Sequence, residues 1–262
     1  MKSGFVNIIG NPNVGKSTLM NALVGEKLSI VTSKAQTTRH RIMGIVNGDG
    51  YQIVYSDTPG ILKPAYELQR SMLEFVDTAI GDADIILYVT DVVEKKDKNA
   101  VYVEKLSKVE CPVIIVINKI DISNQDDVSS LIAQWRELVP RAVIFPASAQ
   151  EKFNLDNIFD AIVENLPENP AWFDENQFTD KSMRFFASEI IREKILENYS
   201  KEIPYCTEVV VESFKEGDEW FSVEDNTPVS MNVWGFTTDY FRYSDEYFKE
   251  FLKDNIEKPK SE

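Results

Sequence analysis

Short apolar runs alternate with amphipathic stretches over the first 165 residues of the chain. The runs that predict strands are FVNIIG (5–10), RIMGIVN (41–47), YQIVYSD (51–57), ADIILYVTD (83–91), CPVIIVIN (111–118) and AVIFPA (142–147). Four of them are nearly continuous in Val, Ile and Leu, which is typical of parallel strands covered by helices on both faces. The stretches with helical spacing predict helices over 16–25, 67–80, 97–108, 126–138 and 154–165.

Two of these runs, 41–47 and 51–57, mix polar and apolar residues and are joined only by Gly48-Asp49-Gly50. A connection this short leaves no room for a helical crossover, so the two runs predict an antiparallel hairpin at the edge of a sheet. Each other pair of successive strands is separated by a predicted helix. The sequence therefore predicts an α/β fold with a mostly parallel, doubly wound sheet.

The periodic pattern breaks after Leu166, where LPENPAWFDENQFTD (166–180) has two prolines and several acidic residues and reads as a linker. Helical spacing returns over 182–203 and stops at Pro204, and CTEVVVESF (206–214) predicts a strand. An amphipathic helix is predicted over 239–256. We therefore expect three parts: a domain of residues 1–168, a linker of residues 169–181, and a smaller α+β domain of residues 182–262.

Composition narrows the class of protein. Hydrophobic residues make up 43% of the chain, yet no apolar run is long enough to span a membrane, and the first residues lack the pattern of a signal peptide. The net charge of −15 argues against nucleic-acid binding through a generally basic surface, although it leaves a local basic patch open. The only cysteines, Cys111 and Cys206, lie in apolar runs, which fits a reducing compartment better than a disulfide framework.

The segment GNPNVGKST (10–18) fits the pattern G-x-x-x-x-G-K-[ST], directly after a predicted strand and at the start of a predicted helix. Its glycines let successive backbone N–H groups point at one anion, and the helix N-terminus adds a partial positive charge. We expect Lys16 to reach the β and γ phosphates of a nucleotide and the Ser17 hydroxyl to bind Mg²⁺. An ordinary glycine-containing turn would explain the letters of the motif but not its position.

A second motif, Asp57-Thr58-Pro59-Gly60, ends the strand predicted over 51–57. A carboxylate at this place can hold Mg²⁺ through water, and the Gly60 amide can sense the γ phosphate. Taken alone, these four residues would read equally well as a surface turn.

Asn118-Lys119-Ile120-Asp121 ends another predicted strand and indicates which base is bound. The Asp121 carboxylate can accept from both the ring N–H and the exocyclic amine of guanine, whereas adenine offers an acceptor and no amine there. We expect Asn118 to brace the phosphate loop and Lys119 to lie over the base. On its own this tetrapeptide is more often a turn.

Ser148 and Ala149 follow the strand predicted over 142–147, where their amides could contact the guanine oxygen. All four motifs stand at carboxyl ends of predicted strands, where open α/β sheets bind ligands. Together they predict a guanine-nucleotide site. The residues expected to bind the nucleotide are Gly10, Asn11, Pro12, Asn13, Val14, Gly15, Lys16, Ser17, Thr18, Asp57, Thr58, Pro59, Gly60, Ile61, Asn118, Lys119, Asp121, Ser148 and Ala149.

Between the phosphate loop and the hairpin lies LSIVTSKAQTTRHR (28–41), whose Thr37-Thr38 pair is the candidate switch. A hydroxyl there can join the Mg²⁺ ligands only while the γ phosphate is present. We expect Ser17, Thr38 and Asp57 to hold Mg²⁺, and Lys16, Thr38 and Gly60 to act in hydrolysis. His40, the only histidine, is expected to be a solvated loop residue and not a catalytic base.

At this point the residues show a family resemblance. GNPNVGKSTLMNALVGEKLSIVTSKAQTTRHRIMGI, DTPG, NKID and SAQ closely resemble the Era GTPases, within the class that also contains tRNA-modifying and ribosome-assembly G proteins. SKAQTTRHRI is the most specific part, and RFFASEIIREKI with KEIPYCTEVVVESFKE resembles the start of the KH domain of Era proteins. The resemblance implies a P-loop G domain followed by a KH-like domain.

The resemblance also implies a function. It implies a slow, Mg²⁺-dependent GTPase that binds small-subunit rRNA near its 3′ end and assists assembly of the small ribosomal subunit. It further implies a monomer in the cytoplasm that is sometimes found at the inner membrane. Ile61 stands where Ras-like proteins carry the glutamine that orients the attacking water. In relatives of this class an asparagine at the position of Asn13 helps to bind K⁺ beside the phosphates, which suggests the same for this chain.

One departure bears on the RNA. A KH domain clamps the nucleic-acid backbone with a G-x-x-G loop, but after Glu216 this chain has only Gly217 and Gly235, an acidic tail and many aromatic residues, so the domain is atypical beyond about 217. The alternative function is therefore a GTP-dependent switch that docks a protein or a membrane and binds no RNA. A tRNA-modification GTPase fits less well, because those relatives carry large extra domains and a C-terminal cysteine motif.

Overall fold

The computed structural model describes residues 1–34, 36–62, 64, 67–94, 100–200, 207–211, 215–216, 221–222, 230–233 and 236–237. The chain divides into two compact units, Met1–Lys181 and Ser182–Glu262. The predicted division into a domain of residues 1–168 and a linker of 169–181 stays a prediction, and in the structure both stretches lie in the first unit.

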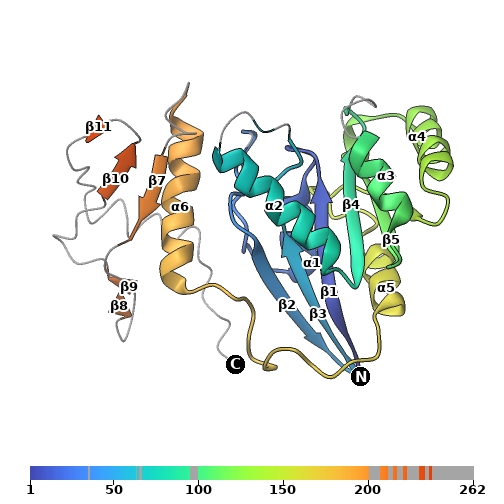
Figure 1. Cartoon of the computed structure of the whole chain (residues 1–262), viewed down its shortest axis with the longest axis horizontal. Helices are drawn as coiled ribbons and strands as arrows, with labels where there is room; N and C mark the ends of the chain where they lie inside the picture. Colours follow the sequence, from blue (N-terminus) through green and yellow to red (C-terminus); the bar gives the residue numbers. More distant parts are fainter. Residues whose placement is uncertain are drawn as a thin grey trace. The chain divides into compact units, whose positions relative to one another are not determined.

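The first unit is built on a six-stranded sheet with the order β2-β3-β1-β4-β5-β6 (Figure 1). Its strands are β1 (Lys2–Gly10), β2 (Ile42–Gly48), β3 (Tyr51–Asp57), β4 (Ile85–Asp91), β5 (Val113–Asn118) and β6 (Val143–Pro146). All neighbours pair in parallel except β2 and β3, which form an antiparallel hairpin. The predicted doubly wound sheet with a hairpin at its edge is thus confirmed.

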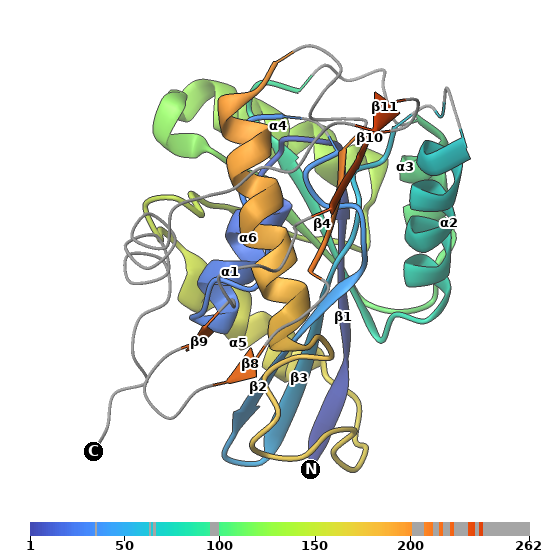
Figure 2. The same cartoon turned by 90° about the vertical axis from the view of Figure 1, so that its left-hand side faces the viewer.

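The helices of the first unit lie on both faces of this sheet. They are α1 (Lys16–Val24), α2 (Glu67–Gly81), α3 (Ala100–Lys108), α4 (Gln125–Leu138) and α5 (Leu155–Asn165). Figures 1 and 2 show α1 and α5 on one face and α2 and α3 on the other. Every residue of β4 and of β5 is buried between the two layers, which explains why their sequences are nearly continuous in apolar residues.

A cluster of buried apolar side chains fills the space between the sheet and the helices α2, α3 and α4. It contains Ile9, Ile61, Val76, Ala79, Ile86, Tyr88, Tyr102, Leu106, Val113, Ile115 and Val139. Trp135 of α4 packs on this cluster, with its ring 5.3 Å from that of Tyr88. The core therefore fixes the carboxyl ends of β1 and β4, from which the phosphate loop and the loop after Asp91 emerge.

The free edge of β2 is covered by residues 172–180, a segment that we call the strap. The Ile45 N–H donates to Phe178 O at 2.8 Å, and Gly44 pairs with Thr179 in an antiparallel bridge. Gln52 is fully buried beneath the strap. Its amide nitrogen donates to the strap backbone, and its amide oxygen accepts from the strap backbone. The strap thus provides hydrogen-bond partners for part of the edge strand β2, whose backbone N–H and C=O groups could otherwise pair with another chain.

The second unit begins with α6 (Met183–Asn198), whose N-cap Ser182 accepts from the Phe185 N–H. The helix predicted over 182–203 thus ends at Asn198, and Tyr199 and Ser200 are not helical. The short strands are β7 (Thr207–Val210), β8 (Lys215–Glu216), β9 (Phe221–Ser222), β10 (Ser230–Val233) and β11 (Phe236–Thr237).

Within this unit β10 pairs with β7 and β11, and β8 pairs with β9. The strand predicted over 206–214 corresponds to β7. The helix predicted over 239–256 and the residue Cys206 lie outside the described residues. Within the part of the chain that the structure describes, the helices are too short or too polar to span a membrane.

Candidate functional site

The phosphate loop connects β1 to α1 and exposes backbone amides at the start of the helix. Gly15, the N-cap of α1, has a φ of 95°, and a Cβ atom on it would overlap the Asn118 side-chain amide. Only glycine fits this conformation and this contact. Because Gly15 has no side chain to accept from the first amides of α1, these amides are available to an anion.

Lys16, the first residue of α1, turns its side chain back over the loop. Its Nζ donates to Asn11 O at 2.8 Å, and the residue is 6% exposed. Burial lowers the pKa of Lys16 to about 8, although the negative charges of Asp57 and Glu94 act in the opposite direction. A cation held at low solvent exposure in the middle of the loop is suited to bind phosphate oxygens.

Three oxygen-bearing side chains from separate parts of the chain meet beside Lys16. The Ser17 hydroxyl donates to Asp57 Oδ2 at 2.7 Å and lies 3.0 Å from the Thr38 hydroxyl. Thr38 Oγ1 in turn donates to Asp57 Oδ2 at 3.3 Å. The structure therefore brings together all three residues that were predicted to hold Mg²⁺.

The structure also separates the two threonines of the candidate switch. Thr38 is 9% exposed and turns toward Asp57, whereas the Thr37 hydroxyl donates to Lys34 O at 2.6 Å within its own loop. Of the two, Thr38 is thus the one placed among the metal-ligand candidates. His40 is exposed, as expected for a loop residue.

The donor set at this point fits Mg²⁺, which prefers carboxylate and hydroxyl oxygens. Asp57 is fully buried, and among the described residues its Oδ1 has no hydrogen-bond partner. Burial raises the pKa of Asp57, while the Lys16 ammonium and the hydroxyls of Ser17 and Thr38 lower it. A buried carboxylate with a free oxygen is stabilised by a cation, so the three residues are suited to hold the predicted magnesium ion.

The turn after β3 lies directly on the phosphate loop. Thr58 Oγ1 donates to Ile8 O at 2.7 Å, and the Ile61 N–H donates to Gly10 O at 3.0 Å. Ile61 is only 6% exposed and belongs to the apolar core. The side chain at this position is therefore withdrawn from the site, which agrees with the expectation that it orients no water.

On the side of the predicted base, Asn118 joins the phosphate loop to the loop after β6. Its Nδ2 donates to Val14 O at 2.8 Å, and its Oδ1 accepts from the Ala149 N–H at 2.9 Å. Asn118 thus braces the loop as predicted. Asp121 is exposed on a 3-10 turn, Ile120–Ile122, where its carboxylate can meet a base.

The amides of Ser148 and Ala149 are engaged within the chain. The Ser148 N–H donates to Phe153 O at 3.3 Å, and the Ala149 N–H donates to Asn118. Their predicted contact with the guanine oxygen stays a prediction. Both residues are buried and hold the loop after β6 against the end of β5.

Two functional candidates were not predicted from the sequence. Asp91, the last residue of β4, lies 2.6 Å from Lys119 Nζ through its Oδ2. Arg41, at the end of the switch segment, donates to Ser56, Asp82 and Asn7 near the C-terminal end of α2. A polar residue at the carboxyl end of a buried strand was the available signal for Asp91, whereas nothing in the local sequence pairs Arg41 with these partners.

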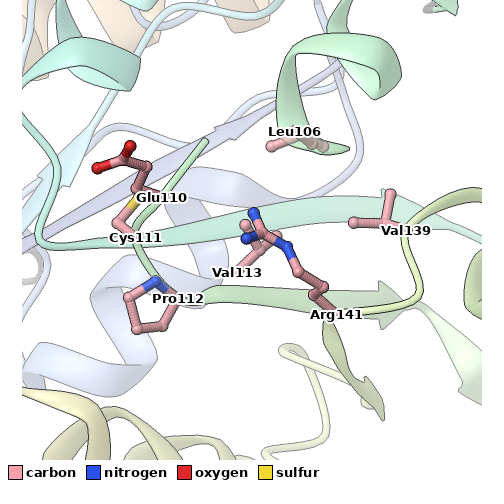
Figure 3. A pocket seen from close by; sticks show the side chains of 7 residues that line it. All are labelled: Leu106, Glu110, Cys111, Pro112, Val113, Val139 and Arg141. Carbon is pink, nitrogen blue, oxygen red and sulfur yellow. The ribbon is translucent and has the colours of Figure 1, made fainter. Parts of the chain in front are cut away.

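A cavity of about 200 Å³ lies away from these motifs, at the amino end of β5 (Figure 3). It is lined by Leu106, Glu110, Cys111, Pro112, Val113, Val139 and Arg141. Cys111 is half-buried and forms no disulfide, and burial raises the pKa of its thiol. Because parallel sheets bind nucleotides at their carboxyl ends, this cavity is not part of the nucleotide site.

Comparison with known proteins agrees with this geometry. Residues 5–119 match the 50S ribosome-binding GTPase family. The chain is 41% identical over 220 residues to GTPase Era of Clostridium kluyveri, covering 84% of this chain and 75% of that protein. It is also 41% identical over 225 residues to GTPase Era of Staphylococcus haemolyticus, covering 85% and 75%.

Two solved structures are similar over most of the chain. One is Era in complex with MgGDPNP and nucleotides 1506–1542 of 16S ribosomal RNA, with a TM-score of 0.78, 40% identity, and 83% of this chain and 74% of that chain covered. The other is a variant of Aquifex aeolicus Era bound to GDP·AlF4⁻, with a TM-score of 0.78, 40% identity, and 83% and 75% covered.

Proposed function

The chain belongs to the Era family of GTPases, and we propose that it uses GTP hydrolysis to control binding of small-subunit rRNA during assembly of the small ribosomal subunit. It is a GTP hydrolase that works with Mg²⁺. The observation that carries the proposal is the convergence of Ser17, Thr38 and Asp57, because it links the phosphate loop, the switch segment and the turn after β3 at one point.

The residues of the site have distinct parts in hydrolysis under this proposal. Lys16 leaves Asn11 O and binds the β and γ phosphates, and Ser17, Thr38 and Asp57 hold Mg²⁺. Bound there, Mg²⁺ neutralises charge that develops on the phosphate oxygens during transfer. Thr38 lies on the 28–41 segment, so its contact with the metal makes the conformation of that segment depend on the γ phosphate.

Hydrolysis is slow in this scheme, because Ile61 is buried in the core and no side chain at that position orients the attacking water. We infer that K⁺ assists, with Asn13 as one of its ligands. Asn13 Nδ2 donates to Ser33 O at 2.9 Å, which joins the phosphate loop to the switch segment and leaves the amide oxygen available as a ligand for a cation. Such a cation would partly replace an arginine finger.

The partner is inferred from the related structure, in which Era holds nucleotides 1506–1542 of 16S ribosomal RNA. The chain carries no G-x-x-G loop after Glu216, so its RNA contacts must differ in part from those of a standard KH domain. We place the protein in the cytoplasm. If it attaches peripherally to the inner membrane, we propose that the second unit makes that contact.

The test is nucleotide-dependent RNA binding by the full chain. A labelled RNA corresponding to the 3′ end of small-subunit rRNA is titrated with protein in the presence of GDPNP or GDP, with Lys16→Ala as the nucleotide control. We expect tighter binding with GDPNP, and no difference between the nucleotides for the Lys16→Ala variant.

Equal RNA binding with both nucleotides would contradict the switch, and no RNA binding would contradict the choice of partner. In the second case, loss of vesicle or protein binding on deletion of residues 239–256 would instead support the docking alternative, which the related rRNA complex does not favour. No binding of GTP at all would contradict the whole assignment.

A further inference from the structure

Asp91 ends β4 directly beside Asn118, with which it is paired in the sheet. The residue is 6% exposed, and its two carboxylate oxygens have different partners. Oδ1 accepts from the Val93 N–H at 3.0 Å, and Oδ2 lies 2.6 Å from Lys119 Nζ. The carboxylate is thus fixed by its own turn and directed at the lysine of the base-binding motif.

The Lys119 side chain is fixed at its base by the backbone conformation and at its tip by hydrogen bonds of Nζ. Its backbone has a φ of 61°, in the left-handed region, and its Nζ donates to Asn13 O at 2.5 Å as well as to Asp91. The methylene groups between these anchors therefore run from the end of β5 across to the phosphate loop. A stretched aliphatic chain of this kind offers a flat, apolar surface on which a purine ring can lie.

We propose that Asp91 is a positioning residue for guanine binding, which acts by holding Lys119 extended along the phosphate loop. This inference rests on the proposed nucleotide site and adds a residue outside its sequence motifs. Without Asp91, Lys119 would keep, among the described residues, the carbonyl of Asn13 as its one side-chain anchor. Its flexible side chain would then have to be ordered by the base itself, and that ordering costs binding free energy.

The location of Asp91 determines which step it affects. It stands on the side of the base and sugar and not beside Ser17, Thr38 or Asp57, so its contribution is common to GDP and GTP. We therefore expect Asp91 to change nucleotide affinity and to leave hydrolysis of bound GTP largely as it is. A residue that only stabilised the fold would show no such separation.

The experiment measures binding of methylanthraniloyl-GDP and methylanthraniloyl-GDPNP to the full chain, together with KM and kcat for GTP. For Asp91→Asn we expect both affinities to fall by about tenfold, as for loss of a hydrogen bond to a charged group that is partly exposed. KM for GTP should rise by a similar factor, with kcat within about twofold of the unchanged protein.

The decisive comparison repeats this substitution in a Lys119→Met background. If Asp91 acts through Lys119, Asp91→Asn should cause no further loss of affinity there, because the group that it positions is gone. A second loss of the same size in that background would overturn the proposal, and so would unchanged affinity for Asp91→Asn alone.

Two further variants complete the design. Asp91→Ser keeps an oxygen that can accept from the Val93 N–H but is too short to reach Lys119, so it should reproduce the loss and serves if Asp91→Asn does not fold. Asp77→Asn breaks a similar but exposed pair with Lys105, at 2.6 Å, and should leave affinity unchanged. If the unchanged protein binds neither nucleotide, the proposed function itself fails.

Discussion

Gly60 lies so close to Pro12 that a Cβ atom on Gly60 would come within 2.7 Å of the Pro12 backbone nitrogen. Next to this contact, the Ile61 N–H donates to Gly10 O at 3.0 Å. The turn after β3 and the phosphate loop are therefore in direct backbone contact. A displacement of either loop must be accommodated by the other, which is what a γ-phosphate sensor requires.

Gly60→Ala should consequently impair hydrolysis. The added methyl group meets backbone atoms of Pro12 that cannot rotate away, so one of the two loops has to shift. Overpacking of this kind costs about 1–3 kcal/mol of folding stability, and we expect phosphate release at saturating GTP to fall by about tenfold or more. Gly81→Ala is the matched control, because a Cβ atom on Gly81 meets nothing within 4 Å. Equal rates for the two variants would contradict this prediction.

The neighbouring threonines of the switch segment should behave differently. Thr38→Ala removes a hydroxyl that contacts Ser17 and Asp57, and we expect affinity for GDPNP to fall by about tenfold while affinity for GDP stays within about twofold. Thr37→Ala removes a hydroxyl that bonds to Thr32 and Lys34 of its own loop, and should change neither affinity. Fluorescent-nucleotide titration in Mg²⁺ measures both, and a larger effect for Thr37 would reverse the assignment.

Nucleotide binding should take up a proton above neutral pH. Burial lowers the pKa of Lys16 to about 8 in the free protein, and bound phosphate should raise this pKa by favouring the ammonium. Because the bound state then holds more protons than the free state, GDP affinity should decrease as the pH rises through 8.

Calorimetry in two buffers with different ionisation enthalpies measures this uptake directly. We expect about half a proton per GDP at pH 8, approaching one at pH 9 and falling toward zero at pH 7. An uptake that does not vary over this range would mean that Lys16 is already fully charged in the free protein.

The inferred role of Asn13 predicts a dependence on the monovalent cation. GTP hydrolysis should be roughly tenfold or more faster in K⁺ than in Na⁺, since the cation replaces part of an arginine finger. Asn13→Gly is the appropriate variant, because Asn13 has a φ of 65° and glycine tolerates that conformation. The ratio of the two rates should fall to about one in this variant. Equal rates in the two salts for the unchanged protein would remove K⁺ from the mechanism.

The order of elements and the sheet could be predicted from sequence because each signal is local. Continuous apolar runs marked β4 and β5, and the short Gly48-Asp49-Gly50 connection marked the hairpin. Element ends were less accurate: β1 begins at Lys2 instead of residue 5, since its first residues pair with β3 in spite of their polarity. The strap was not predicted for a related reason, because its contacts with β2 and β3 come from backbone groups and from the polar side chains of Asn47 and Gln52.

Within the site, the sequence predicted the residues whose spacing is fixed by a motif and missed those that act across the fold. Ser17, Thr38 and Asp57 were each suggested by a separate pattern, and the structure brings them together. Asp91 and Arg41 meet their partners only through strand pairing and helix packing, and such long-range contacts leave no spacing in the sequence. Thr38 was already chosen over Thr37 from the sequence, and the two hydroxyls point in directions that agree with this choice.

The strap offers a final test, centred on Gln52. The Gln52 amide is fully buried and makes four hydrogen bonds: its Nε2 donates to Asn47 Oδ1 and Phe173 O, and its Oε1 accepts from the N–H groups of Trp172 and Phe173. Gln52→Leu keeps a similar volume but leaves three backbone groups of the strap without these partners. We expect the free energy of unfolding to fall by about 2–4 kcal/mol, measured by urea titration.

The same variant should loosen the strap before the first unit unfolds, because the strap then keeps only its hydrogen bonds to Met43, Ile45 and Asn47 of β2 among the described residues. Trypsin should then cut after Lys181 faster than in the unchanged protein, and the fluorescence of Trp172, whose ring lies 5.4 Å from that of Phe5, should change. Gln125→Leu, at an exposed position at the start of α4, is the control and should alter neither property. If the free energy of unfolding is the same for Gln52→Leu and Gln125→Leu, the strap is held by its own side chains and not by the Gln52 amide.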